Sequence, residues 1–289
     1  MSCCKGGTVH HGEAAGREDT MHGINVYITR PANNVTPKGI IVFISDAFGW
    51  KFINSRLLAD KYAAKGQFLV LLPDFMNGNE MSTAMIPVLN QFETPASLLT
   101  TIFIKPLLAV RIAINGIPFA LKNLFRHAAI ADFIRALRAS EPLFETKDLK
   151  IGVVGFCWGG THAIRLAHDD PRTQVRRHGS QATSGDPAPL VECAFAAHPS
   201  MLRFPGDVEK VALPLSVVVG DLDSQLSEEN AWKMKEILEV KKKGDHEVDI
   251  IAGAKHGFAL RLNPDNENEV ANAELAEQQA INFLTKWVT

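Results

Sequence analysis

The six residues 155–160, with the sequence GFCWGG, carry the clearest chemical signal in this chain. An apolar run, residues 151–155, leads into them, and a helical pattern leaves from Gly160 through Leu166. Glycines on both sides of Cys157 remove Cβ atoms that would clash in a sharp strand-to-helix turn. Such a turn places the sulfur at a helix N-terminus, where the dipole favours the thiolate. The spacing predicts a nucleophilic cysteine, with a buried structural cysteine as the alternative.

An acid and a base follow this cysteine in the chain order nucleophile, acid, base. Asp221 and Asp223 come after the apolar run 215–219, and His256 follows a run that ends near Ile251. Both loops begin where predicted strands end, at the edge of an open α/β sheet that binds ligands. His256 would take the thiol proton and later activate water, and a carboxylate would fix its tautomer. We expect Asp223 in that role, with Asp221 as the alternative; His256 could also be an ordinary surface histidine.

A nucleophile of this kind needs two backbone N–H groups that stabilise the oxyanion formed during attack. One should belong to Trp158, the residue after the nucleophile, and the other to a loop that follows an early strand. That loop is residues 45–49, directly after the apolar run 40–44, and Ala47 is our candidate donor.

Short apolar runs predict the strands that position these residues. Runs of this kind suit strands buried on both faces of a parallel sheet; they are residues 40–44, 68–72, 151–155, 193–197, 215–219 and 248–251. Alternation over 24–28 indicates a half-buried edge strand, and helical spacing occurs over 54–65, 130–137 and 273–288. Alternating strands and helices predict a doubly wound α/β fold, with a mostly parallel central sheet and helices on both faces.

The chain divides into an irregular N-terminal arm, residues 1–22, and a single α/β domain, residues 23–289. Within that domain, residues 95–125 form an apolar insertion. Lys105, Pro106, Arg111, Pro118 and Lys122 interrupt it, so we expect helical pieces lying over something apolar and not a membrane span. The insertion is interpreted either as a lid over a hydrophobic site or as helices that complete the core.

Composition restricts the function further. Thirty basic and 32 acidic residues give a net charge of −2, which excludes a nucleic-acid binder that relies on bulk positive charge. Four cysteines are too few for a disulfide scaffold, and the first residues lack the pattern of a secretory signal, so we expect a cytoplasmic protein. Cys3, Cys4, His10 and His11 fit no structural zinc spacing, and no metal site is expected.

These residues resemble the dienelactone hydrolase family, which has the α/β-hydrolase fold. The resemblance runs from about Ile24 to the C-terminus and depends on residues 46–49, Pro73-Asp74, the GFCWGG turn, Asp223 and residues 256–258. It implies a cysteine nucleophile that acts on ester or lactone carbonyls without a cofactor. It also implies that Asp46 holds the resting cysteine, although most of the family carries the longer Glu there.

Further positions bear on the subgroup and the substrate. Cys3-Cys4 followed by His11-Gly12 is similar to a fungal subgroup of the family. Bacterial members place a Ser after the catalytic His and an Arg three residues later, where this chain has Gly257 and Leu260, with Arg261 one place out of register. An anionic dienelactone is therefore not the expected substrate. Side chains that could line a pocket are those of Phe48, Arg111, His198 and Phe258, with His198 alternatively structural.

The sequence thus predicts a cysteine-dependent hydrolase of ester or lactone bonds in a small apolar or aromatic substrate. The same triad could instead serve acyl transfer or cyclisation in a biosynthetic pathway, and a non-catalytic binding protein is a third interpretation. A small molecule is the expected partner, without nucleic acid, and a homodimer is left open.

Overall fold

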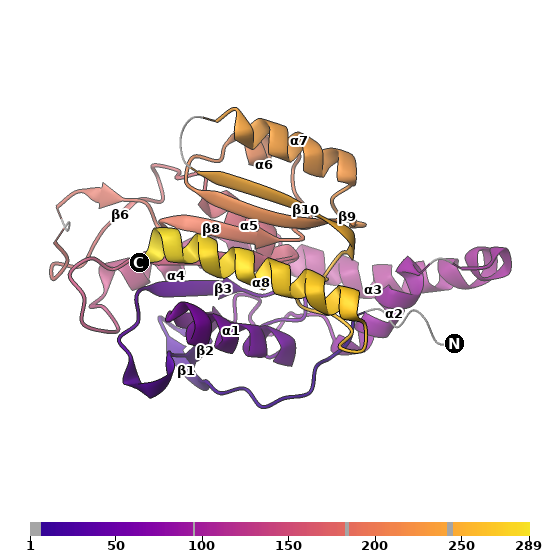
Figure 1. Ribbon diagram of the computed structural model, residues 1–289, viewed down its shortest axis with the longest axis horizontal. Coiled ribbons are helices and arrows are strands. Elements are labelled where there is room, and N and C mark those ends of the chain that lie inside the picture. Colours follow the sequence, from indigo (N-terminus) through magenta and orange to yellow (C-terminus); the bar gives the residue numbers. More distant parts are fainter. Residues whose placement is uncertain (1–6, 95, 183–184, 242–244) are drawn as a thin grey trace.

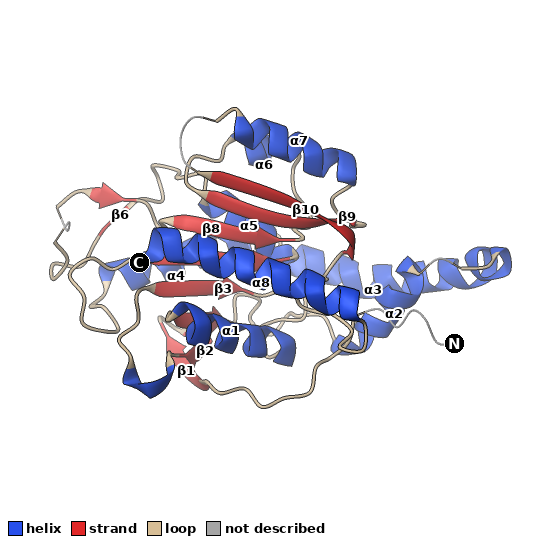
Figure 2. Ribbon diagram, viewed as in Figure 1, coloured by secondary structure: helices blue, strands red, loops and turns tan. Residues whose placement is uncertain are grey.

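An eight-stranded sheet forms the centre of the computed structural model, which describes residues 7–94, 96–182, 185–241 and 245–289 (Figures 1 and 2). The strand order is β1-β2-β4-β3-β5-β8-β9-β10. The strands are β1 (Arg17–Met21), β2 (Ile24–Thr29), β3 (Ile40–Ile44), β4 (Leu69–Pro73), β5 (Ile151–Phe156), β8 (Cys193–Ala197), β9 (Leu215–Leu222) and β10 (His246–Lys255). The pairs from β4 to β10 are parallel, whereas β1 and β2 are antiparallel to their neighbours. The expected doubly wound architecture is therefore confirmed.

Helices cover both faces of this sheet, which explains why its central strands are continuously apolar. On β3, Ile40, Val42 and Ile44 belong to a core layer that also contains side chains of α4 (Arg126–Ala139), α5 (Trp158–Leu166), α6 (Gly206–Glu209) and α7 (Glu228–Glu239). Ile41 and Phe43 point the other way and pack with α1 (Ile53–Gly66) and α8 (Glu267–Val288). Successive side chains of a strand alternate between faces, so only an unbroken apolar run can fill both layers.

The N-terminal segment departs from the sequence prediction. Residues 17–21, expected to be irregular, form β1 at the edge of the sheet and pair with β2. The strand 24–28 was expected at that edge and lies one place further in. The sequence REDTM of β1 is exposed on nearly every residue, so no apolar period marked it as a strand. Cys3 and Cys4 lie outside the described residues.

Smaller elements complete the described fold. They comprise the 3₁₀ turns Ala32–Asn34 and Thr83–Met85 and the short antiparallel pair β6 (Val175–Arg176) and β7 (Pro187–Ala188). An apolar helical hairpin follows β4 and consists of α2 (Ile86–Glu93), a π-helical turn (Thr100–Ile104) and α3 (Lys105–Asn123).

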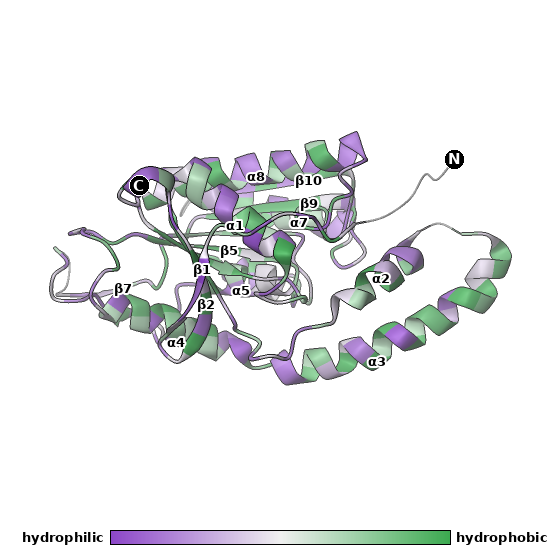
Figure 3. Cartoon of the chain, turned by 90° about the horizontal axis from the view of Figure 1, so that it is seen from below, coloured by the Kyte–Doolittle hydropathy of each residue, from purple (hydrophilic) through white to green (hydrophobic). Residues whose placement is uncertain are grey.

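This hairpin projects from the body of the molecule (Figures 1 and 3). It was expected to lie over apolar structure, but the helical stretch Thr100–Asn123 is largely exposed. By length and composition alone, that stretch is long and apolar enough to cross a membrane. Only part of one face of α3 is packed, where Leu108 and Ile112 meet a cluster containing Phe48 and Phe52.

The register of the sheet places the candidate residues side by side. Lys255 at the end of β10 pairs with Leu222 at the end of β9, so the next residues, His256 and Asp223, emerge together. Phe156 pairs with Ala197 in the same way, which brings Cys157 beside the loop that starts at His198. Parallel strands therefore deliver all these side chains to one edge of the sheet.

Candidate active site

The strand-to-helix turn holds Cys157 in a strained conformation. Its φ is 52° and its ψ is −113°, in a region that residues with a Cβ rarely adopt. A Cβ on Gly155 would lie 2.1 Å from the carbonyl oxygen of Gly159, and one on Gly159 would lie 2.2 Å from that of Ile44. Both glycines are therefore required by close backbone packing, which is the physical content of the Gly-x-Cys-x-Gly spacing.

The loop after β8 holds the turn in place. The Cys157 N–H donates to the carbonyl of Ala197 at 3.1 Å, and the Ser200 N–H donates to the Cys157 carbonyl at 3.1 Å. The Thr161 hydroxyl donates to the carbonyl of Ser200. These bonds offset the backbone strain, so the sulfur keeps a fixed position above the sheet edge.

A cysteine, an imidazole and a carboxylate form a continuous hydrogen-bonded chain. Nε2 of His256 lies 3.1 Å from Sγ of Cys157. Nδ1 of the same ring lies 3.0 Å from each carboxylate oxygen of Asp223. The side chains of His256 and Asp223 are 7% and 0% exposed, so solvent screens their interaction little. The structure therefore brings together the three residues that the sequence proposed as nucleophile, base and acid.

The electrostatics favour a thiolate–imidazolium pair. Burial by itself would raise the pKa of the Cys157 thiol, but the charge and hydrogen bond of His256 outweigh burial and lower that pKa below its ordinary value. Burial would lower the pKa of His256, yet the Cys157 charge and the bonds to Asp223 and Cys157 raise it to about 10. Both shifts favour the form with the proton on the imidazole and the negative charge on the sulfur, and the thiolate is the nucleophilic form of a cysteine.

The two candidate acids have different surroundings. Oδ1 of Asp223 faces His256 and also accepts the N–H groups of Gln225 and Leu226, at 2.7 and 3.2 Å. Oδ1 of Asp221 instead accepts the N–H of Gly253, at 2.7 Å. The structure thus brings Asp223 to the imidazole, while Asp221 joins β9 to the end of β10.

Two backbone N–H groups are available for an oxyanion. Within the described part of the chain, those of Ala47 and Trp158 make no backbone or side-chain hydrogen bond. Ala47 follows β3 and Trp158 opens α5, and these elements lie next to each other because β3 pairs with β5. The Trp158 ring packs edge-on against Phe119 of α3, with centroids 6.4 Å apart, so α3 supports one side of this region.

Asp46 does not hold the sulfur as the family resemblance implied. Its Oδ1 accepts the N–H of Phe48 at 3.0 Å, and its Oδ2 has no hydrogen-bond partner among the described residues. An aspartate is one methylene shorter than a glutamate, and here it folds back onto its own turn. Burial raises the pKa of the Asp46 carboxyl, and the charge of Arg261 opposes that effect.

Two side chains near Cys157 and His256 were not among the site residues expected from the sequence, although Arg261 was noted as one place out of register. The Ser200 hydroxyl lies 3.5 Å from Sγ of Cys157, within reach of a sulfur hydrogen bond. Ser200 directly follows the His198-Pro199 step, of which only His198 was considered as a pocket residue. Arg261 is 8% exposed, lies 5.3 Å from the Phe48 ring and occupies the space that a Cβ on Gly257 would fill. The sequence signal for this buried arginine was Gly257, at the position where bacterial members of the family have Ser.

The structure places the expected pocket residues in different surroundings. His198 is fully buried and packs edge-on against the rings of His256 and Phe258, with centroids 5.1 and 5.8 Å away. It therefore lies behind the catalytic imidazole instead of lining an open pocket. Phe48 is buried next to Arg261, whereas Arg111 is exposed on α3 and is not part of this group.

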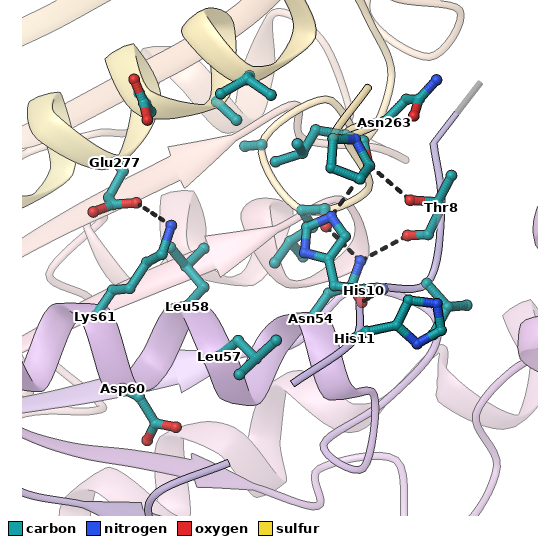
Figure 4. Close-up of a pocket in the computed structure, with 18 of the residues that line it drawn as sticks. Thr8, His10, His11, Asn54, Leu57, Leu58, Asp60, Lys61, Asn263 and Glu277 are labelled. Atoms are coloured by element: carbon teal, nitrogen blue, oxygen red, sulfur yellow. Dashed lines mark hydrogen bonds and ion pairs between the residues drawn. The ribbon is translucent and has the colours of Figure 1, made fainter. Parts of the chain in front are cut away.

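Two cavities flank the loop that carries His256. One of about 60 Å³ is lined by His256, Arg261 and the end of α2, including Asn90 and Glu93. A larger one, of about 1090 Å³, lies between α1, α8 and the N-terminal arm (Figure 4). Lys61 and Glu277 form an ion pair along its wall, but the catalytic candidates do not line it. The smaller cavity reaches His256, whereas Cys157 and Asp223 line neither of the two. No cluster of three His, Cys, Asp or Glu side chains suited to a metal occurs among the described residues.

Known proteins resemble this chain over nearly its whole length. It is 25% identical to hydrolase pyvD of Aspergillus violaceofuscus, covering 99% of this chain and 96% of the relative. It is 26% identical to a carboxymethylenebutenolidase homolog of Xenopus tropicalis, with 99% and 96% covered. The solved structure of a dienelactone hydrolase from Anabaena variabilis matches with a TM-score of 0.51 at 16% identity, covering 96% of this chain and 99% of that one.

The fold is shared with further solved structures. A dienelactone hydrolase-like promiscuous phosphotriesterase, P91, from metagenomic libraries matches with a TM-score of 0.53 at 18% identity, covering 91% and 92% of the two chains. These likenesses show the α/β-hydrolase fold. The sequence profile of the dienelactone hydrolase family matches residues 24–288, from β2 through α8. This chain is therefore a member of the dienelactone hydrolase family.

Proposed function

We propose that this protein hydrolyses carboxylic ester or lactone bonds by nucleophilic catalysis through Cys157. The observation that carries the proposal is the chain of contacts from Sγ to His256 at 3.1 Å and from His256 to Asp223 at 3.0 Å. The thiolate attacks the carbonyl carbon, and the N–H groups of Ala47 and Trp158 stabilise the oxyanion. In serine enzymes, one such donor contributes about 3–4 kcal/mol to the transition state.

The single proton that Cys157 and His256 share is sufficient for a complete catalytic cycle. When the tetrahedral intermediate collapses, the leaving alkoxide takes the proton of the His256 imidazolium, and a thioester on Cys157 remains. The neutral imidazole then removes a proton from water as that water attacks the thioester. Collapse of the second intermediate releases the acid and restores thiolate and imidazolium. Asp223 holds the ring and stabilises its charge throughout.

The surroundings favour a small substrate with an apolar or aromatic body. Aromatic side chains gather around the sulfur and the imidazole, including Phe48, Phe119, Trp158 and Phe258. The packed face of α3 bounds one side of this region, since it contacts the cluster that contains Phe48 and also Trp158. Arg261 lies near enough to Asp46 for its charge to oppose the rise in the pKa of that carboxyl.

Hydrolysis in ¹⁸O-labelled water tests this function. With p-nitrophenyl acetate and an aromatic lactone as substrates, the acid product should contain one ¹⁸O atom. Intact-mass spectrometry after rapid quenching should show an acyl adduct on the wild type but not on Cys157→Ala. A fully active Cys157→Ala variant would refute the nucleophile. An unlabelled product carrying the acyl group on an added alcohol would indicate acyl transfer instead.

A further inference from the structure

The α2–α3 hairpin exposes an apolar surface that the catalytic site does not explain. From residue 98 to 125, twelve large apolar side chains are 40–83% exposed. They are Leu98, Leu99, Ile102, Phe103, Ile104, Leu107, Val110, Ile114, Ile117, Leu121, Leu124 and Phe125. Monomeric soluble proteins rarely expose a continuous apolar patch above a few hundred Å². This surface therefore calls for a partner.

The exposed side chains follow a regular spacing along the helix. Phe103, Leu107, Val110, Ile114, Ile117, Leu121 and Leu124 are separated alternately by four and three residues. This 4-3 spacing repeated over three heptads is the a/d pattern by which one helix packs against another. The opposite side of α3, with Leu108 and Ile112, is already packed on the chain's own body. The free stripe therefore fits a second helix of matching pattern.

We propose that α3 pairs antiparallel with α3 of a second copy of this chain, across a two-fold axis. A fully exposed aliphatic or aromatic side chain offers roughly 60–120 Å² of apolar area. Twelve such side chains, exposed as they are here, supply roughly 500–900 Å² per copy. Twice that area matches the roughly 1,200–2,000 Å² of a stable interface. A two-fold axis also makes the interface closed, so the pairing ends at a dimer.

One antiparallel register pairs six of the seven positions of the stripe, from Leu107 to Leu124, and leaves only Phe103 outside the paired segment. It places Leu107 against Leu124 of the partner subunit, Val110 against Leu121 of the partner subunit, and Ile114 against Ile117 of the partner subunit. All three layers are apolar, and symmetry repeats them. Beside the stripe, Ala113 would face Ala120 of the partner subunit, and small residues there let the helix axes approach closely.

The ends of the hairpin favour the same direction. Leu98, near the tip, is 75% exposed, and Phe125, at the base, is 83% exposed. The antiparallel register sets Phe125 beside Leu107 of the partner subunit, so the exposed base is covered, whereas Leu98 lies beyond the paired segment. A parallel pair would instead set tip against tip.

Mass measurement in solution is the first test. Light scattering after gel filtration should give twice the 31.6 kDa mass of the chain. Leu107→Asp and Ile114→Asp each place a carboxylate in the stripe, and each should raise the dimer dissociation constant at least about 100-fold. Val240→Asp, at a side chain 78% exposed outside the hairpin, is the matched control and should remain dimeric. Circular dichroism and thermal melting verify that the variants are folded.

Disulfide trapping tests the direction. In a Cys3→Ser, Cys4→Ser background, the pair Leu107→Cys and Leu124→Cys should form covalent dimers on mild oxidation. Leu107→Cys alone should not, because its two copies lie about 26 Å apart along the axis. Cross-linking by Leu107→Cys alone would overturn the antiparallel arrangement. A monomeric wild type would overturn the dimer, and flotation of that monomer with vesicles containing phosphatidylserine would assign the surface to lipid instead.

Discussion

Replacing the carboxylate of Asp223 by an amide is the sharpest test of the proposed chemistry. Asp223→Asn preserves the shape of the side chain and an oxygen that can accept the Nδ1 hydrogen of His256. It removes the negative charge that lies 3.0 Å from that ring. Since the hydrogen bond and the charge of Asp223 both raise the pKa of His256, the imidazolium should lose its proton more easily in the variant.

The distance sets the size of the effect. At an effective dielectric constant of about 20, opposite unit charges about 3 Å apart attract by about 5.5 kcal/mol. The two side chains are 7% and 0% exposed, so bulk water weakens this attraction little. A loss of that size corresponds to a factor of about 10⁴. Because the asparagine oxygen can still orient the ring, we expect kcat/KM to fall by about 10³- to 10⁴-fold.

The neighbouring acid provides the control. Asp221→Asn removes an equal charge two residues away, but Asp221 bonds the N–H of Gly253 and not the imidazole. It should retain kcat/KM within about threefold, with a modest loss of stability of about 1 kcal/mol. The assays are ester hydrolysis and the rate of Cys157 alkylation by iodoacetamide, which reports the thiolate. If Asp223→Asn keeps more than a tenth of the activity, or if Asp221→Asn is the inactive variant, the assignment of the acid is wrong.

Four further results are expected. Alkylation of Cys157 should remain fast at pH values below 9.0, the ordinary pKa of a thiol, and should become slower in His256→Asn. The value of kcat/KM should decline as pH passes about 10, where His256 loses its proton. Cys157 and His256 together hold one proton in the folded protein and, between the ordinary pKa values of 6.5 and 9.0, also one proton in the unfolded chain. The free energy of unfolding measured in urea should therefore not vary with pH through this pair in that range, and it should fall on either side of the range. Ser200→Ala removes the hydroxyl that lies 3.5 Å from the sulfur of Cys157. This variant should slow alkylation of Cys157 at pH 7 by about two- to tenfold. An unchanged rate would show that the hydroxyl does not stabilise the thiolate. Gly159→Ala places a Cβ 2.2 Å from the carbonyl oxygen of Ile44 and should lower Tm by several degrees. Gly179→Ala is the control, because the space around Gly179 is open, and it should leave Tm unchanged. Equal melting curves for the two variants would contradict the close packing of the turn.

The predictability of the site differed from residue to residue. Cys157, Asp223 and His256 were recognisable because each follows an apolar run and the sheet delivers the ends of parallel strands to one edge. Arg261 and Ser200 were not, since no local pattern shows which way a loop side chain turns. Both came to the site through contacts between loops that are distant in the chain.

Local patterns on their own established the layered α/β fold, the strained turn at Cys157 and the order of nucleophile, acid and base. These features follow from short-range constraints, such as strand burial and the space that glycine frees. Tertiary structure alone decided that Asp46 bonds its own turn, that Arg111 is exposed, and that β1 extends the sheet. It also showed that the apolar hairpin covers little of its own chain. Each of these depends on what packs against a side chain from elsewhere in the molecule, and a linear pattern carries no such information.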